Sequence, residues 1–504
     1  MDKIIVRKKN ETFLEIECDA GIAMELSEHF CFYVPGYKFM PAYRNRMWDG
    51  KIRLFDLRKR TLYVGLFHYI QEFADVRQYT VEVDDNSYYS RPDTKQIIDM
   101  EEFAKTLTLT AGGNPITPHD YQWNSVELAL SNTKQLLLSP TASGKSLIIY
   151  MLMRYYLDMY DNNVLIIVPT TSLVEQLYSD FADYSQFDEW NVEENVHKIY
   201  GGKDKHGFTE RVIISTWQSI YKMGHKWFEG YGMVIGDEAH AFKAKSLTSI
   251  LEKCTEAKYR VGTTGTLDGT QTHQLVLEGL FGPVHKVTTT KKLIDDKKLA
   301  QLDINVLLLK YSDQHCQLVK NMKYPDEIDF IVGYEPRNNF ITNLALDQEG
   351  NTLILFQYVE KHGKPLFELV KKKVQEKFAR PEEKKIFYVS GETDVQTREE
   401  IRSITESQDN AIIVASMGTF STGINIKRLH NIIFASPSKS QIRVLQSIGR
   451  GLRKSGDGID TIVYDIADDL HWKTRKNYTL KHSGERIKIY SKEKFKYAIH
   501  EVDI

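Results

Sequence analysis

The sequence has few cysteines, no long apolar run and no excess of charge of either sign. Its four cysteines lie far apart, at positions 18, 31, 254 and 316, without the histidines that would complete a zinc site. The pattern therefore predicts neither a disulfide framework nor a cysteine-bound metal. No apolar stretch reaches the ~18 residues that a membrane-spanning helix needs. We expect a soluble, cytoplasmic protein without a membrane partner.

Charge balance excludes a uniformly basic body of the kind found in histone-like proteins. The chain of 504 residues has 66 Lys and Arg against 68 Asp and Glu, a formal net charge of −2. Any site for a polyanion must therefore be local. At about 150 residues for a typical domain, the length predicts three to four domains.

From about residue 130, short β-branched runs alternate with helix-length segments, which is typical of parallel sheets built from strand-helix-strand units. The first set of runs is 136–138, 164–168, 212–215, 233–236 and 259–263, and the second is 352–356, 385–389, 411–415, 431–435 and 461–465. We predict an α/β fold with two tandem doubly wound parallel-sheet domains and a small α+β domain before them. The predicted divisions are 1–112, 113–298, 299–470 and a basic C-terminal tail at 471–504, with an exposed connection near 285–300.

A phosphate-binding loop is predicted at Ser139-Pro-Thr-Ala-Ser-Gly-Lys-Ser146, which follows a strand and opens a helix. Backbone N–H groups near Ser143 and Gly144 can surround a β-phosphate, Lys145 can reach the γ-phosphate and Ser146 can bind Mg²⁺. Ser139 stands where the usual pattern has its first glycine. Taken alone, this segment could also be an ordinary turn and helix start.

Two further motifs fit ATP hydrolysis. Asp237 and Glu238 end a buried strand in the sequence Asp-Glu-Ala-His, so that Asp237 can hold Mg²⁺ and Glu238 can orient the attacking water. In the second lobe, Gln446 precedes Arg450 and Arg453, whose guanidinium groups suit the charge that develops on a transferring phosphoryl group. Alone, the acidic pair could be a solvated turn and the arginines a charged helix surface.

Taken in order, the motifs resemble those of superfamily 2 helicases, which implies RecA-like domains and an ATPase that uses ATP and Mg²⁺. In that resemblance Gln122 reads adenine and His240, Thr264 and Thr266 couple the sites. The residues that resemble ATP contacts are Gln122, Thr141, Ala142, Ser143, Gly144, Lys145, Ser146 and Gly423. Those that resemble nucleic-acid contacts are Thr170, Thr171, Thr216, Trp217, Ser390, Gly391, Ser416, Ser421 and Thr422. Hydroxyl groups of this kind hold phosphates without reading bases.

Residues 36–60 carry eight basic side chains against two acids, interleaved with aromatic rings. Cations beside aromatic rings can neutralise phosphates and stack on bases, although a solvated hairpin would have the same composition. The candidate DNA contacts here are Arg44, Arg46, Trp48, Lys51 and Arg53. The Trp-Asp-Gly-Lys sequence at 48–51 resembles phage recombination helicases of the UvsW type, which would place the protein in the cytoplasm of a host cell.

The resemblance implies an ATP-dependent DNA helicase that remodels branched DNA in recombination and repair, through branch migration, fork regression, and D-loop or Holliday-junction processing. It implies single-stranded and branched duplex DNA as partners of a monomeric motor, with recombination or single-strand-binding proteins as further candidates. The residues themselves indicate only a nucleic-acid-dependent ATPase. An RNA-remodelling helicase, a nucleotide-gated DNA-binding or annealing protein and the motor subunit of a restriction complex stay open as alternatives.

Overall fold

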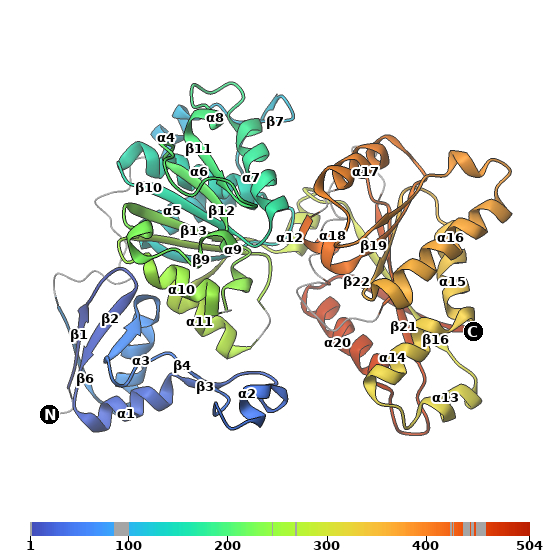
Figure 1. Ribbon diagram of the computed structural model, residues 1–504, viewed down its shortest axis with the longest axis horizontal. Coiled ribbons are helices and arrows are strands. Elements are labelled where there is room, and N and C mark those ends of the chain that lie inside the picture. The colour runs from blue at the N-terminus through green and yellow to red at the C-terminus, as the bar shows by residue number, and fades with distance from the viewer. Residues whose placement is uncertain are drawn as a thin grey trace. The chain divides into compact units, whose positions relative to one another are not determined.

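The chain forms two compact units, Met1–Ser139 with Gly144–Val287 and Pro140–Ser143 with Thr288–Ile504 (Figure 1). The computed structural model describes residues 3–84, 100–243, 245–267, 270–423, 426, 428–436, 444, 448–449 and 460–504. In these ranges no helix combines the length and the apolar character that crossing a membrane requires.

The first unit begins with a four-stranded sheet in the order β5-β2-β1-β6. Its strands are β1 (Lys3–Lys8), β2 (Phe13–Glu17), β5 (Thr61–Tyr63) and β6 (Thr80–Val83), with helices α1 (Ala20–His29) and α3 (Phe67–Arg77). Side chains of β1 alternate, because successive residues of a strand point to opposite faces, and Ile4 and Val6 are fully buried. The predicted α+β domain is confirmed.

An arm extends from this sheet (Figure 1). It consists of the two-stranded ribbon β3 (Cys31–Tyr33) and β4 (Lys51–Arg53), and the loop between the strands contains the short helix α2 (Pro41–Arg44). The ribbon is antiparallel, with Phe32 opposite Ile52. The arm therefore holds most of the basic segment singled out in the sequence.

The N-terminal sheet is docked on the rest of the first unit through buried contacts. The fully buried Arg260 donates to Thr12 Oγ1 over 2.6 Å, and Tyr63 Oη donates to Glu252 over 2.6 Å. A Cβ added to Gly65 would lie 1.9 Å from the carbonyl oxygen of Glu278, so the two backbones approach closely. Because one hydrophobic cluster runs through both parts, the N-terminal sheet packs as part of the first unit.

The larger sheet of the first unit has seven parallel strands in the order β11-β12-β10-β13-β14-β9-β15. They are β9 (Lys134–Leu138), β10 (Asn163–Val168), β11 (Val196–Ile199), β12 (Val212–Thr216), β13 (Tyr231–Asp237), β14 (Tyr259–Thr264) and β15 (Val284–Lys286). The helices are α4 (Met100–Thr106), α5 (Asp120–Asn132), α6 (Lys145–Met159), α7 (Thr171–Tyr184), α8 (Val192–Asn195), α9 (Trp217–Ile220), α10 (Lys245–Lys253) and α11 (Gln271–Phe281). A hairpin of β7 (Thr110–Ala111) and β8 (Asn114–Pro115) precedes α5. All five predicted strands are present.

The second unit has a seven-stranded parallel sheet in the order β18-β19-β17-β20-β21-β16-β22. Its strands are β16 (Leu302–Lys310), β17 (Thr352–Phe356), β18 (Ile386–Val389), β19 (Ile412–Ser416), β20 (Asn431–Phe434), β21 (Thr461–Asp469) and β22 (Lys496–Asp503). The helices are α12 (Thr290–Asp295), α13 (Asp313–Val319), α14 (Tyr324–Gly333), α15 (Glu335–Leu346), α16 (Lys364–Lys377), α17 (Val395–Ser407), α18 (Met417–Gly423) and α20 (Tyr478–Lys492). The predicted pair of parallel-sheet domains is confirmed.

Two segments differ from the expectation. Residues 285–300 were expected to be an exposed connection, but they contain β15 and α12, and Leu293 and Leu299 are buried. Residues 471–504 were set apart as a tail, yet α20 packs on β21 and β22 forms the edge strand beside β16. The precise domain boundaries stay predictions.

Candidate functional site

Three of the predicted ATP motifs lie side by side at one edge of the first sheet. Strands β13, β14 and β9 are neighbours and parallel, so their carboxyl ends point the same way. Asp237 ends β13, Thr264 ends β14 and the phosphate loop follows β9. This edge is where open parallel sheets bind ligands, because the loops and helix N-termini meet there. Residues separated by more than 90 positions are thereby brought together.

The phosphate loop has the backbone shape that its sequence predicts. Gly144, which precedes α6, has φ +80°, and a Cβ there would lie 2.2 Å from Gln122 Nε2. Glycine is therefore required by both conformation and space. Ala142 also has a positive φ, +65°. Ser139, at the position of the missing first glycine, is fully buried, and its N–H donates to Thr264 O over 2.8 Å.

Gln122 is buried at the start of α5. Its Oε1 accepts from the backbone N–H of His119 over 2.7 Å, which completes a capping box. The amide Nε2 lies toward Gly144, as the contact with a Cβ added there shows. The structure thus brings the residue predicted to read adenine against the phosphate loop.

Lys145 and the acidic pair form a compact charged cluster. Lys145 Nζ lies 2.8 Å from Glu238 Oε1, and His240 Nδ1 lies 3.2 Å from Glu238 Oε2. Asp237 is buried and accepts from Thr263 Oγ1 over 2.7 Å. Burial raises the pKa of Asp237 against the opposing charge of Lys145. Burial acts on the pKa of Glu238 in the same sense, but Lys145 and His240 outweigh it and hold this pKa well below its ordinary value.

Glu238 also has an unusual backbone conformation, with φ +51°. A non-glycine residue in the left-handed region costs of order 1–3 kcal/mol and is maintained only when its surroundings impose it. The turn after β13 directs this carboxylate toward Lys145, as their 2.8 Å separation shows. Sequence reasoning had no signal for this strain, because glutamate carries no preference for positive φ.

A hydrogen-bonded chain leads from the acidic pair to the end of β14. His240 Nδ1 lies 3.0 Å from Thr264 Oγ1, and Thr264 Oγ1 donates to Thr266 O over 3.1 Å. The threonine hydroxyl gives its hydrogen to that carbonyl, so it accepts from His240, which fixes a proton on Nδ1. Thr266 Oγ1 is buried and has no hydrogen-bond partner among the described residues. The three predicted coupling residues are thus contiguous.

The donor groups at this edge fit a magnesium nucleotide. Mg²⁺ in nucleotide sites takes one or two protein oxygens and completes its shell with phosphates and water. Ser146 Oγ and the buried carboxylate of Asp237 are hard oxygen ligands of this kind, and Ser146 Oγ lies 2.8 Å from Tyr184 Oη of α7. Tyr184 was missed in the sequence, because nothing there links α7 to the phosphate loop.

Candidate nucleic-acid contacts in the first unit lie at the ends of the neighbouring strands β10 and β12. Thr170 caps α7, since its Oγ1 accepts from Leu173 N over 3.3 Å, and Thr171 is exposed. Thr216 is buried, with its Oγ1 2.9 Å from Ser219 Oγ, and Trp217 is half-buried at the start of α9. Helix capping and side-chain packing therefore already engage some of these hydroxyl groups. Their contact with nucleic acid stays a prediction.

The second unit places its candidates in the same way. Ser390 and Gly391 follow β18, and Ser416 ends the adjacent strand β19 with its Oγ donating to Thr419 Oγ1 over 2.7 Å. Gly391 is exposed, with no atom within 4 Å of an added Cβ. Ser421, Thr422 and Gly423 lie in α18, and their side chains are outside the described part of the chain. Gln446, Arg450 and Arg453 lie wholly outside the described residues.

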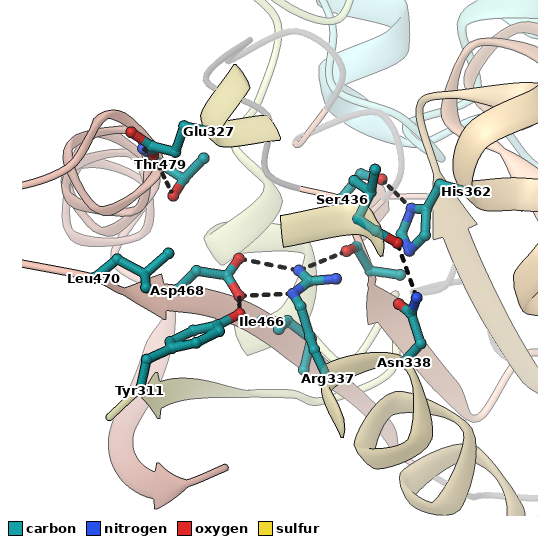
Figure 2. Close-up of polar contacts among 12 residues, drawn as sticks. Tyr311, Glu327, Arg337, Asn338, His362, Ser436, Ile466, Asp468, Leu470 and Thr479 are labelled. Atoms are coloured by element: carbon teal, nitrogen blue, oxygen red, sulfur yellow. Dashed lines mark hydrogen bonds and ion pairs between the residues drawn. The ribbon is translucent and has the colours of Figure 1, made fainter. Parts of the chain in front are cut away.

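A buried polar cluster supports the carboxyl end of β20, from which the chain runs on to those arginines (Figure 2). Arg337 Nε donates to Asp468 Oδ1 over 2.6 Å, and its Nη2 donates to Asp468 Oδ2 over 3.0 Å and to Ala435 O over 2.9 Å. Ser436 Oγ accepts from Gln357 N over 3.1 Å and lies 2.9 Å from His362 Nδ1. Burial first and Arg337 second lower the pKa of His362 to about 3. This side chain is therefore neutral.

The five candidates on the N-terminal arm have different surroundings. Arg44 and Arg46 are exposed, whereas Arg53 is ion-paired with Asp49. Lys51 Nζ lies 4.9 Å from the centre of the Tyr33 ring. Trp48 is half-buried, and its Nε1–H donates to Lys51 O over 2.8 Å. Stacking of the Trp48 ring on a base, as the sequence suggested, has no direct support from this packing.

Two parallel sheets, with a phosphate loop, an acidic pair and a linking threonine at one edge of the first sheet, define the class of tandem RecA-like ATPase cores. Residues 115–269 match the model of the type III restriction enzyme res subunit, and residues 337–455 match the helicase conserved C-terminal domain. Residues 3–84 match the N-terminal domain of DNA helicase UvsW. The class is that of superfamily 2 helicases.

Comparison of whole chains identifies the family. The ATP-dependent DNA helicase uvsW of Enterobacteria phage T4 is 36% identical over 507 residues, which cover 97% of this chain and 98% of the relative. The crystal structure of T4 UvsW matches with a TM-score of 0.52 at 34% identity and covers 99% of each chain. The chain belongs to the UvsW family of DNA helicases, as the sequence resemblance predicted.

A more distant structure shares the fold alone. The ATP-dependent type ISP restriction-modification enzyme LlaBIII, bound to DNA, matches with a TM-score of 0.56 at 16% identity. The match covers 86% of this chain and 34% of that protein.

Proposed function

We propose that this chain is an ATP-driven DNA motor that remodels branched DNA in recombination and repair, through branch migration, fork regression, and D-loop or Holliday-junction processing. The observation that carries the proposal is the chain of contacts from Lys145 through Glu238 and His240 to Thr264. These contacts join the hydrolytic residues to the carboxyl-terminal edge of the sheet, where the predicted nucleic-acid contacts of the first unit begin. The match to the N-terminal domain of DNA helicase UvsW supports DNA as the substrate, and branched DNA is what the family resemblance implies.

Each residue of the cluster has a role in the proposed hydrolysis. Lys145 leaves Glu238 to neutralise the γ-phosphate, and the released carboxylate orients and polarises the attacking water. Ser146 and Asp237 would hold Mg²⁺, which neutralises charge on the phosphates when bound. Gln122, beside the loop, contacts the adenine, and the backbone of residues 141–144 surrounds the phosphates. Gln446, Arg450 and Arg453 are expected to serve hydrolysis, and Gly423 to contact ATP, as the resemblance to superfamily 2 helicases implies.

We propose that residues at the strand ends couple ATP hydrolysis to DNA binding and hold the DNA backbone. When Lys145 leaves Glu238, the contact of Glu238 with His240 changes and, through it, those of Thr264 and Thr266. Hydroxyl and backbone groups at residues 170–171, 216–217, 390–391, 416 and 421–422 would hold DNA phosphates irrespective of sequence. We further propose a monomeric motor that acts in the host-cell cytoplasm and has recombination or single-strand-binding proteins as partners.

The test compares wild type with Lys145→Ala and the matched control Lys222→Ala, whose lysine is exposed in the same unit. ATPase rate is measured at one salt concentration without nucleic acid and with single-stranded DNA, duplex, a four-way junction and matched RNA. We expect stimulation by DNA with a further gain on the junction, loss of turnover in Lys145→Ala and junction migration by wild type. Stimulation by RNA alone would favour an RNA-remodelling helicase, and annealing without ATP turnover would favour a nucleotide-gated binding protein.

A further inference from the structure

The tip of the N-terminal arm exposes several large apolar side chains on one loop. Phe39 is 77% exposed and Met47 is 81% exposed, in the loop between β3 and β4, with Met40 between them at 38%. Single exposed apolar residues are common on protein surfaces, but several on one short loop indicate a contact site. Trp48, the aromatic DNA-contact candidate from the sequence, lies in the same loop, but Phe39 and Met47 are far more exposed.

The loop that carries these exposed side chains is held in place by packed aromatic rings. The rings of Tyr33 and Tyr37 stack at 4.7 Å between centroids, and Tyr43 meets Tyr37 edge-on at 4.7 Å. A Cβ on Gly50, which has φ +82°, would lie 2.3 Å from the Tyr37 ring, so only glycine lets the ring pack there. The Met47 N–H donates to Ala42 O over 2.9 Å and closes the loop. The exposed side chains are thus carried on a preorganised support.

Unpaired cations surround the apolar tip. Lys38, Arg44 and Arg46 are exposed, and within the described ranges none has a carboxylate within 4.0 Å. The nearby acid, Asp49, is bound to Arg53, whose hydrogen bond lowers the pKa of Asp49 to about 2. The pair is therefore neutral overall. An apolar tip with a basic rim is complementary to stacked bases between two phosphate backbones, whereas a protein-binding surface has no need of this excess of positive charge.

We propose that Phe39 and Met47 insert between base pairs at the branch point of DNA while Lys38, Arg44 and Arg46 hold the flanking phosphates. The inference rests on the proposed function for its substrate and adds how the branch is opened. Apolar wedges unstack a base step at a cost of a few kcal/mol in duplex DNA. The cost falls where pairing is already interrupted, so a wedge of this kind favours branch points over continuous duplex.

The experiment uses the full-length protein and a synthetic four-way junction with 2-aminopurine at the branch. The double variant Phe39→Ala/Met47→Ala is compared with wild type and with Val76→Ala, because Val76 is also 81% exposed in the N-terminal domain but lies on α3. We expect wild type and Val76→Ala to raise the fluorescence of the branch-point base before ATP is added. The double variant should not raise it, and its branch-migration rate should fall by about tenfold, the loss expected for one stacking contact.

Two further measurements separate the wedge from general binding. ATPase stimulation by single-stranded DNA should be unchanged in the double variant, since the tip acts only at branches. Phe39→Trp should retain unstacking, because an aromatic ring still fills the step. Arg44→Ala/Arg46→Ala should lower the slope of log affinity against log salt by about two.

If the double variant raised the fluorescence of the branch-point base and migrated branches as well as wild type does, the wedge would be overturned. That result would favour a protein partner for the tip. If wild type itself showed no DNA-stimulated ATPase, the proposed function would fail instead. The two failures are therefore distinguishable.

Discussion

Replacing Glu238 by glutamine tests whether its charge, as distinct from its shape, drives hydrolysis. Oε1 of this residue lies 2.8 Å from Lys145 Nζ and Oε2 lies 3.2 Å from His240 Nδ1. Glutamine keeps the volume and one carbonyl oxygen that can accept from Lys145, so the local fold should survive. It removes the negative charge that polarises water.

The size of the effect follows from the role. We take the loss of a carboxylate that orients and polarises the attacking water to be on the order of 10²–10⁴-fold in rate, the range for positioned acid–base groups. At ~1.36 kcal/mol for each factor of ten, we expect the barrier to rise by about 2.7–5.4 kcal/mol. Nucleotide affinity should hold or increase, because Lys145 loses an anionic partner that competes with the γ-phosphate. A large loss of turnover with retained binding is therefore the expected signature.

The assay measures phosphate release at saturating single-stranded DNA and binding of a fluorescent ATP analogue. Glu229→Gln is the matched control, because Glu229 is exposed and its Oε1 lies 3.6 Å from His225 Nδ1, far from the ATP motifs in sequence. Turnover within threefold of wild type would refute the assignment of Glu238. A fall in turnover that is matched by a fall in affinity would show that the residue serves nucleotide binding instead.

Three further predictions concern stability. Asp468→Asn leaves the fully buried Arg337 without a countercharge, which should cost about 3–5 kcal/mol and lower the midpoint of urea unfolding; an unchanged midpoint would contradict this. His362 has a folded pKa of about 3, below its ordinary 6.5, so the unfolded chain takes up the proton first and stability should fall as pH drops from 6.5 toward 3. In His362→Gln the thermal midpoint of unfolding should therefore depend less on pH over this range. A pH dependence as steep as that of wild type would contradict the role of His362. Gly65→Ala should loosen the N-terminal sheet, since its Cβ would lie 1.9 Å from Glu278 O, and resistance to limited proteolysis equal to that of wild type would refute the close contact.

The sequence predicted the central strands well, because buried parallel strands read as continuous β-branched runs. The run at 352–356 coincides with β17, and the run at 164–168 differs from β10 by one residue. Of the four edge strands of the two large sheets, β11, β15 and β22 were not among the predicted runs, whereas β18 was. β22 has mostly exposed residues and no apolar run, and its place is fixed by pairing with β16, which lies nearly 200 positions earlier.

Motif order also predicted which ATP-site residues would meet, because parallel strands bring their carboxyl ends to one edge. Contacts made by residues outside the motifs could not be foreseen. Thr263 and Tyr184 bond to Asp237 and Ser146 through packing that no local pattern encodes. The exposed state of Phe39 was equally hidden, since a phenylalanine near tyrosines in a sequence more often joins a buried cluster.

The docking of the N-terminal domain bears on how force could reach DNA. Strand β14 begins with Tyr259 and Arg260, and Arg260 is bonded to Thr12 of the N-terminal sheet. The same strand ends at Thr264, which contacts His240 of the ATP site. Four residue steps at about 3.3 Å each, from Arg260 to Thr264, thus separate the two contacts by roughly 13 Å of extended backbone. Because Glu11 N also bonds to Thr255 O, the N-terminal sheet and the hydrolytic cluster belong to one packed body.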